Sequence, residues 1–539
     1  MWLTALVLTT LLEDAASTPW WNNALYYRIL VDSFKDMDGD GLGDLQGVTK
    51  QLSYVRALGA DAVILSPISS RSMDCSKPGT MDFVDIDERY GNIEQFTTLI
   101  EKAKKLELKV LVTLPLQTIS ENSELFNFSA ERKAGFENKV IWREGSTDEQ
   151  PVNEIGIDNW TWHDDRKAYY ASSSKEVLFN LCSEELVTML SDVQCTWLRR
   201  RASGVLLQPD FPSNIDCGVQ LIEKLVVAAM SCSRTTNMDA PVILVETSFG
   251  AEIGVKYYGE SGLGANSVIS YALAETKPAA GLALALHAAI LYPPQDMNPT
   301  WITSISNKSR IASRHGSDMV DAITMLALTL PGATIIQQGD ELGSVDTILE
   351  WAAISKCWPT QGVPSAAPFP WDDTPKASFT TGEPWLPLSP NYRYANAKTE
   401  YANDLSHFGI VRVASAMRNS SILGPHVEIK RIGDALAILR WGGSGSLLYI
   451  SNLGRGQSEV QLSRIPGLPT EMTVAISSSG SSLSPGFHVN LDKVLKLSSG
   501  ETAFLVGSPR HCGGPGPVDK IANKLSEGWQ KINKYFSSL

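Results

Sequence analysis

Eight short apolar runs in the first two thirds of the chain constrain its fold more than any other sequence feature. Segments with the length and amphipathic spacing of helices separate most of them, which is typical of repeated strand–helix units around a parallel sheet. Eight units predict a (β/α)8 TIM barrel. The predicted strands are Ala24–Ile29, Ala62–Ser66, Lys109–Leu114, Gly204–Leu207, Val242–Glu246, Ser267–Tyr271, Trp301–Ile305 and Thr334–Gln337.

Two regions depart from the barrel pattern. Residues 121–175, between the third and fourth predicted strands, are rich in Trp, Tyr, Asn and Asp, and we predict a small inserted domain there. From residue 404 to 508 short alternating strands are separated by Gly and Ser, which predicts a C-terminal all-β sandwich domain. The barrel itself then takes residues 19–120 and 176–403.

The chain begins with an apolar run of about a dozen residues followed by the small residues Ala15-Ala16-Ser17. We interpret residues 1–18 as a signal peptide or as a truncated signal anchor, because a complete membrane span needs ~20 apolar residues. Either interpretation places the chain outside the cell, in the medium or at the cell surface.

The last predicted region, residues 509–539, is a Gly/Pro breaker followed by an amphipathic helical tail. Ile521, Leu525, Trp529 and Ile532 recur at intervals of four, four and three, which is one face of a helix. We expect this face to dock on its own protein or the helix to stay solvated. Contact with a membrane surface or a partner is the alternative, because lysines lie on or near the polar face.

Charge and cysteine content narrow the class of protein. The formal net charge is −13, and no block of Lys or Arg could form a basic stripe, so nucleic acid is excluded as an expected partner. The 7 cysteines lack the close pairing of a zinc site, so disulfides are expected, with one thiol left over. Four glycosylation sequons agree with an extracellular glycoprotein; they begin at Asn127, Asn159, Asn307 and Asn419.

An acidic loop follows the first predicted strand. Asp36, Asp38, Asp40 and Asp44 lie at alternating positions, with glycines that permit tight turns and the backbone carbonyl of Leu42 between them. Calcium prefers six to eight oxygen ligands of this kind, so the loop predicts a structural Ca²⁺ site. It is not an EF-hand, because the twelfth position lacks the bidentate Glu.

Several motifs together resemble the alpha-amylase family of glycoside hydrolases, specifically its alpha-glucosidase and oligo-1,6-glucosidase branch. The resemblance covers roughly residues 20–508 and implies the barrel, the inserted domain and the calcium loop described above. The segments that carry it are Trp20–Arg28, Asp32–Phe34, the acidic loop with Leu45-Gln46-Gly47, Ile86–Gly91, Leu330–Ala333, Gly339–Gly343 and Trp371-Asp372.

Retaining glycoside hydrolysis requires two carboxyl groups about 5–5.5 Å apart. The resemblance places the family's general acid at Glu246, but its nucleophile position holds Gln208 and its third catalytic carboxylate is replaced by Asn307. Asp210 lies about 6–7 Å further along the strand than Gln208, too far to replace the nucleophile. We therefore expect no catalytic residues and no enzyme activity, with Glu246 a relic or a hydrogen-bonded polar group.

A glycoside hydrolase scaffold without its carboxylates resembles the extracellular domain of the heavy chains of heteromeric amino-acid transporters, of the rBAT type. That resemblance implies a non-catalytic subunit that brings a multi-spanning light chain to the cell surface and stabilises it. Membrane association would then require the partner or an incomplete N-terminal anchor. The alternatives are a secreted pseudoenzyme that binds a carbohydrate, and an active alpha-glucosidase if the strand alignment is displaced.

Overall fold

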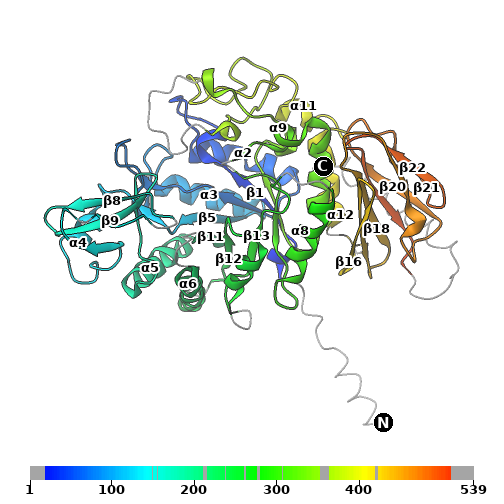
Figure 1. Ribbon diagram of the computed structural model, residues 1–539. Helices are drawn as coiled ribbons and strands as arrows, with labels where there is room; N and C mark the ends of the chain where they lie inside the picture. Colours follow the sequence, from blue (N-terminus) through cyan, green and yellow to red (C-terminus); the bar gives the residue numbers. More distant parts are fainter. Residues whose placement is uncertain are drawn as a thin grey trace, which may run out of the picture.

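Figure 1 shows the computed structural model, in which the barrel lies between a small sheet domain and a C-terminal β domain. The structure describes residues 19–510 except 149, 154–155, 210–214, 237, 260–262, 276–278, 306–307, 352–362, 419 and 421–422. The predicted N-terminal signal segment, the predicted helical tail from residue 511, Asp210, Asn307 and Asn419 lie outside the described residues.

Eight parallel strands form a closed barrel in the order β1-β15-β14-β13-β12-β11-β5-β2, which confirms the predicted fold class. The strands are short, mainly buried and rich in Val, Ile and Leu, as expected of strands covered on both faces. The strands are β1 (Leu25–Ile29), β2 (Ala62–Leu65), β5 (Lys109–Pro115), β11 (Gly204–Gln208), β12 (Val242–Glu246), β13 (Ser267–Ser270), β14 (Thr300–Ile302) and β15 (Thr334–Gln337).

Helices surround most of the barrel, and several begin at side chains that cap free backbone N–H groups. Asn92 and Gln95 form a reciprocal capping box at the start of α3, and Ser183 caps α5. The helices of the barrel and its C-terminal edge are α2 (Leu45–Ala57), α3 (Ile93–Lys105), α5 (Glu184–Arg199), α6 (Ile215–Thr235), α7 (Ala251–Gly254), α8 (Ala279–Leu291), α9 (Ile311–His315), α10 (Val320–Thr329), α11 (Ala397–Tyr401) and α12 (His407–Arg418).

The insertion after β5 contains α4 (Glu124–Ala130) and a small antiparallel sheet. Its aromatic residues form the core of this unit: Phe126 packs against Trp142 and Tyr170. The strands are β6 (Thr118–Ile119), β7 (Trp142–Glu144), β8 (Asn159–His163), β9 (Ala168–Ser173) and β10 (Glu176–Leu178); a separate hairpin pairs β3 (Ser69–Arg71) with β4 (Thr80–Ile86).

The C-terminal domain is all-β, as predicted, but it begins at β16 and not at residue 404, because residues 407–418 form helix α12; the domain packs on α8, α10 and α12. One contact between the domains is made by Ser479, whose backbone N–H and hydroxyl donate to Asp321 of α10; the other oxygen of Asp321 pairs with His407 of α12. The strands are β16 (His426–Ile432), β17 (Ala435–Trp441), β18 (Ser446–Asn452), β19 (Ser458–Gln461), β20 (Glu471–Ser477), β21 (His488–Asn490), β22 (Val494–Leu497) and β23 (Thr502–Gly507).

Two disulfides fix α6 against α5 and the residues before it. Cys182 is bonded to Cys217 and Cys195 to Cys232, and Cys75 is also disulfide-bonded. Disulfides of this kind persist in oxidising compartments. Within the described part of the chain, none of the helices combines the length and the apolar character that crossing a membrane demands.

Candidate active site

The inward-facing side chains of the barrel strands change from apolar to polar at the carboxyl ends of the strands. Tyr26, Leu206, Leu244 and Ile335 belong to one buried cluster inside the barrel. Because side chains on a strand alternate, the inward-facing residues two positions later form the next layer. In four strands that layer is Arg28, Gln208, Glu246 and Gln337, at the end of the barrel where the sites of this fold are built.

Glu246 lies at the centre of this polar layer and is 4% exposed. Arg28 of β1 donates to both carboxylate oxygens, Nη1 to Oε1 at 2.8 Å and Nη2 to Oε2. Gln208 Nε2 donates to Oε2 at 2.7 Å, and Tyr271 Oη donates to Oε1 at 2.9 Å. These four hydrogen bonds use about all the acceptor sites that a carboxylate offers, so a substrate must displace one donor to reach Glu246.

The surroundings of Glu246 favour its ionised form. Burial alone raises the pKa of this carboxyl group, but the charge of Arg28 and the hydrogen bonds from Arg28, Gln208 and Tyr271 outweigh burial. The pKa is therefore below its usual value. At neutral pH Glu246 is a carboxylate that can accept a proton, and it becomes a proton donor only as the pH falls.

The structure brings two of the predicted site residues together. Gln208 and Glu246 lie on neighbouring strands and are hydrogen-bonded, so an amide does stand beside the family's general-acid position. Asn307, the third, lies outside the described residues, and so does Asp210. Thr113 of β5 is buried and donates to the backbone oxygen of Leu65 at 2.7 Å.

Sequence reasoning missed Arg28 and Tyr271 as members of this site. One signal was available: Arg28 is the only charged residue in a strand that is otherwise buried and apolar or aromatic. A buried arginine requires an acidic partner or several acceptors. Which acid it would meet could not be deduced, because Glu246 is 218 positions away.

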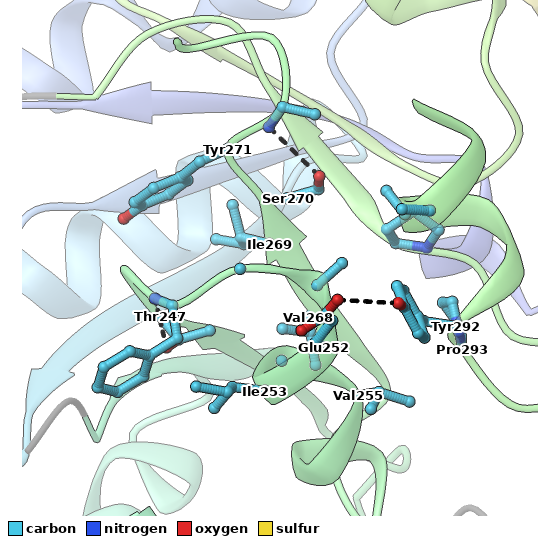
Figure 2. A pocket seen from close by; sticks show the side chains of 18 of the residues that line it. Thr247, Glu252, Ile253, Val255, Val268, Ile269, Ser270, Tyr271, Tyr292 and Pro293 are labelled. Atoms are coloured by element: carbon cyan, nitrogen blue, oxygen red, sulfur yellow. Dashed lines mark hydrogen bonds between the residues drawn. The ribbon is translucent and has the colours of Figure 1, made fainter. Parts of the chain in front are cut away.

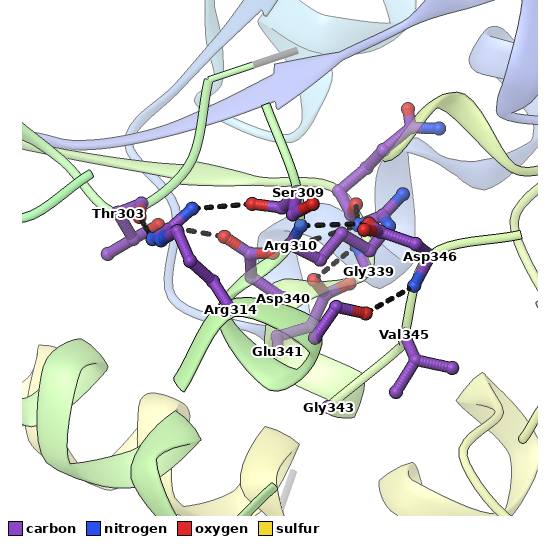
Figure 3. A network of polar contacts seen from close by, with 12 residues as sticks. Thr303, Ser309, Arg310, Arg314, Gly339, Asp340, Glu341, Gly343, Val345 and Asp346 are labelled. Atoms are coloured by element: carbon purple, nitrogen blue, oxygen red, sulfur yellow. Dashed lines mark hydrogen bonds and ion pairs between the residues drawn. The ribbon is translucent and has the colours of Figure 1, made fainter. Parts of the chain in front are cut away.

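A second buried polar network follows β15 (Figure 3). Thr303 donates to Asp340 at 3.0 Å, and Arg310 lies 3.7 Å from the same carboxylate. Glu341 accepts hydrogen bonds from the hydroxyls of Tyr27 and Tyr54 at 2.6 and 2.9 Å, and from the backbone N–H of Gly339. Burial without a directly paired cation raises the pKa of Glu341 to about 7.

The acidic loop brings three of its predicted ligands together. One carboxylate oxygen each of Asp36, Asp38 and Asp40 lies within 4.8 Å of the others. Asp44 has a different position: it caps α2 by accepting from Gly47 N and also accepts from Met37 N. Burial, followed by the charges of neighbouring aspartates, raises the pKa of Asp40, which is the effect a bound cation would relieve.

Two of the predicted sequons lie in the described residues. The side chains of Asn127, in α4, and Asn159, in β8, are both exposed. Asn159 donates its side-chain amide to Thr161 of its own sequon at 3.0 Å. Both asparagines are on the inserted domain, away from the polar layer of the barrel.

Comparison with known proteins gives the family. The catalytic domain of alpha amylase matches residues 28–209 and 266–424. Maltase 1 of Drosophila virilis is 28% identical over 518 residues, which cover 85% of this chain and 82% of the maltase. An alpha-glucosidase of Culex pipiens is 26% identical over 91% of this chain and 92% of its own length.

Solved structures agree with the fold. An alpha-glucosyl transfer enzyme superimposes with a TM-score of 0.78 at 22% identity, covering 91% of this chain and all of the other. The trehalulose synthase of Pseudomonas mesoacidophila gives 0.77 at 20% identity over the same shares. At this identity the likeness establishes the fold alone.

These findings correct the functional predictions made from the sequence. The relatives are maltases and alpha-glucosidases, so the predicted non-catalytic transporter subunit and the prediction of no enzyme are wrong. Single missing carboxylates weigh less than similarity to maltases and alpha-glucosidases over 85–91% of this chain. The expected light-chain partner and cell-surface location depended on that interpretation and are not carried forward.

Proposed function

Because the chain belongs to the alpha-amylase family, we propose that it is an extracellular enzyme that acts on α-glucosides, with Glu246 as its proton-transferring group. The observation that carries this proposal is Glu246 itself, a buried carboxyl group at the end of β12 held by three polar side chains. The disulfides support an extracellular location, and two relatives are salivary alpha-glucosidases.

The chemistry has to accommodate Gln208, because an amide forms no glycosyl ester in the way that a carboxylate does. We propose that Glu246, once protonated, gives its proton to the glycosidic oxygen as the bond to the anomeric carbon breaks. A water or sugar hydroxyl then forms the new bond to that carbon and releases its own proton to solvent. Gln337, whose buried amide has no hydrogen-bond partner among the described residues, offers a donor and an acceptor to sugar hydroxyls.

Release of glucose from maltose and from p-nitrophenyl α-glucoside tests this proposal. We expect activity to rise as the pH falls, because the lowered pKa of Glu246 leaves little of the acid form at pH 7. Glu246→Gln should reduce kcat by roughly 10²–10⁴-fold, the usual contribution of a positioned acid. No glucose from the natural chain at any pH would overturn the proposal.

A pair of variants at residue 208 isolates the effect of the amide. Gln208→Asp puts a carboxylate beside Glu246 and should raise kcat by roughly 10²-fold, because an attacking group becomes available. Gln208→Asn has the same length but keeps an amide, so it is the matched control and should give no gain. Equal rates in the two variants would show that this position has no part in the reaction.

The acidic loop supports a second proposal, a structural calcium ion on Asp36, Asp38 and Asp40 with the carbonyl oxygen of Leu42. An ion that binds only the folded chain stabilises it by mass action, about 2.7 kcal/mol at a hundredfold excess over Kd. We expect EDTA to lower Tm and calcium to restore it. Asp38→Asn with Asp40→Asn should remove both responses, whereas an unchanged Tm in the natural chain would contradict the site.

A further inference from the structure

Helix α8 presents an apolar stripe to solvent. None of its 13 residues is charged, and Ala280, Leu284, His287 and Leu291 follow one another on its exposed side at intervals of four, three and four. Leu284 is 72% exposed and Leu291 77%. The surface of α3, by comparison, carries Glu94, Glu101 and Lys104. A barrel helix with leucines in place of such charges indicates a surface that another element covers.

A cavity of about 330 Å³ lies beside this stripe (Figure 2). Ala288 and Tyr292 line it from the α8 side, Val268 and Ile269 from β13, and Ile253 from α7. In the described part of the connection from β12 to β13, the helical elements are the four-residue α7 and a short 3-10 helix, Val255–Tyr258, and residues of both line the cavity. A full-length helix would normally cover this part of the barrel.

Carboxylates lie at the edge of this apolar surface. Glu252 accepts a hydrogen bond from Tyr292 at 3.1 Å, as Figure 2 shows, and Glu275 also lines the cavity. The chain as a whole has a net charge of −13. An occupant with an apolar face and flanking positive charges would therefore match this surface in both respects.

We propose that the C-terminal segment of this same chain, residues 518–536, forms a helix that docks on the α8 stripe and places Trp529 against the cavity. Its apolar residues Ile521, Leu525, Trp529 and Ile532 span eleven positions, the same span as from Ala280 to Leu291. Either stripe is therefore about 16 Å long at 1.5 Å per residue. The segment also contains four lysines against two carboxylates.

The described chain ends beside two strands that contact α8. Arg510 pairs with Glu428 of β16 at 2.5 Å and lies over the ring of Trp441 in β17. Both of these strands pack against α8. The residues from 511 to 517 can extend over roughly 23 Å at 3.3 Å each, several times the ~5 Å between neighbouring strands, and β16 is the edge strand of its sheet.

Hydrogen exchange on α8 tests the proposal in the natural chain and in a chain ending at Arg510. Docking should slow exchange of residues 279–292 roughly tenfold in the longer chain, because the stripe must be uncovered before those amides open. Trp529→Ser should remove this protection. Gln530→Ser, on the opposite face of the same helix, is the matched control and should preserve it. The double variant Leu284→Asp, Leu291→Asp changes the α8 surface instead of the tail, and it should also abolish the slower exchange.

Three outcomes would overturn the proposal. Equal exchange of α8 with and without the tail would show that the tail covers another surface or none. Protection that increases with protein concentration, together with a larger particle in light scattering, would identify a second copy as the occupant. Protection that appears only with phosphatidylserine vesicles would make the surface a membrane contact.

Discussion

Two buried glutamates, Glu246 and Glu341, show how neighbouring residues of one strand create opposite electrostatic environments. Arg28 of β1 points into the barrel and pairs with Glu246, whereas Tyr27 points outward and donates to Glu341. The pKa of Glu246 is lowered, and that of Glu341 is raised to about 7. Both side chains are almost completely buried, so the difference comes from the partners and not from the degree of burial.

Hydrogen bonds from neutral donors do not by themselves hold the pKa of a buried carboxyl group at its usual value. Glu341 accepts from Tyr27, Tyr54 and Gly339 and still has a raised pKa, because neutral donors only partly offset the loss of water. Glu246 has a full guanidinium charge beside it. Glu246 is therefore the anion of an ion pair inside the barrel. Glu341, in the network after β15, is a neutral acid at mildly acidic pH.

The largest expected effect comes from removing the cation of the first site. Arg28→Met should lower the free energy of unfolding by about 3–5 kcal/mol, because it leaves Glu246 charged, buried and without its partner. Denaturant unfolding at pH 7 measures the loss. The double variant Arg28→Met with Glu246→Gln should recover a large part of it, since no unpaired charge remains. A single variant as stable as the natural chain would show that the pair is not formed.

A pH series distinguishes the two glutamates by sign. Glu341 has a folded pKa of about 7 against 4.5 unfolded, so its protonated form favours folding and stability decreases as pH rises from about 4.5 to 7. The decrease amounts to about 3 kcal/mol at most. Glu246 acts in the opposite direction: its stabilisation is present above its unfolded pKa and is lost as pH falls through the lower folded value.

Two substitutions check this sign by unfolding at each pH. Glu341→Gln should flatten the decrease in stability between pH 4.5 and 7. The loss of stability at more acidic pH, which depends on Glu246, should stay unchanged. Glu246→Gln should lower stability at every pH above about 4.5, where the ion pair with Arg28 is formed, and should flatten the loss of stability at acid pH. The assignment fails if Glu341→Gln leaves the pH profile between 4.5 and 7 as it was.

The smallest effect is expected from the tyrosines that hold Glu341. Tyr54→Phe removes one hydrogen bond at 2.9 Å and should cost about 1–2 kcal/mol, and the pKa of Glu341 should rise further. Tyr401→Phe is a matched control, because its side chain is 49% exposed. Unfolding at pH 6 measures both. Equal stability of the two variants would show that the hydroxyl of Tyr54 contributes nothing.

Much of the fold could be predicted because barrel strands are local patterns. All eight predicted strands are present, and β12 and β15 have the predicted bounds, since short apolar runs between helix-length segments have few other interpretations. Because side chains alternate between the two faces of a strand, the sequence also predicts which of them share a face. This is how Gln208 and Glu246 come to lie in one layer. The acidic loop was likewise visible as a spacing of aspartates within nine residues.

Local sequence patterns predicted the barrel, the all-β C-terminal domain and the identity of the residues at the carboxyl ends of the strands. They did not determine what those residues do. The missing carboxylate suggested a protein without activity, and similarity to a maltase over 85% of the chain corrected that prediction. The contacts of Arg28 with Glu246, and of Tyr27 and Tyr54 with Glu341, join residues 218, 314 and 287 positions apart and are visible only in the folded chain. The physical reason is that closing the barrel, and not any local preference, brings β1 beside β15 and sets which charge each buried carboxyl group faces.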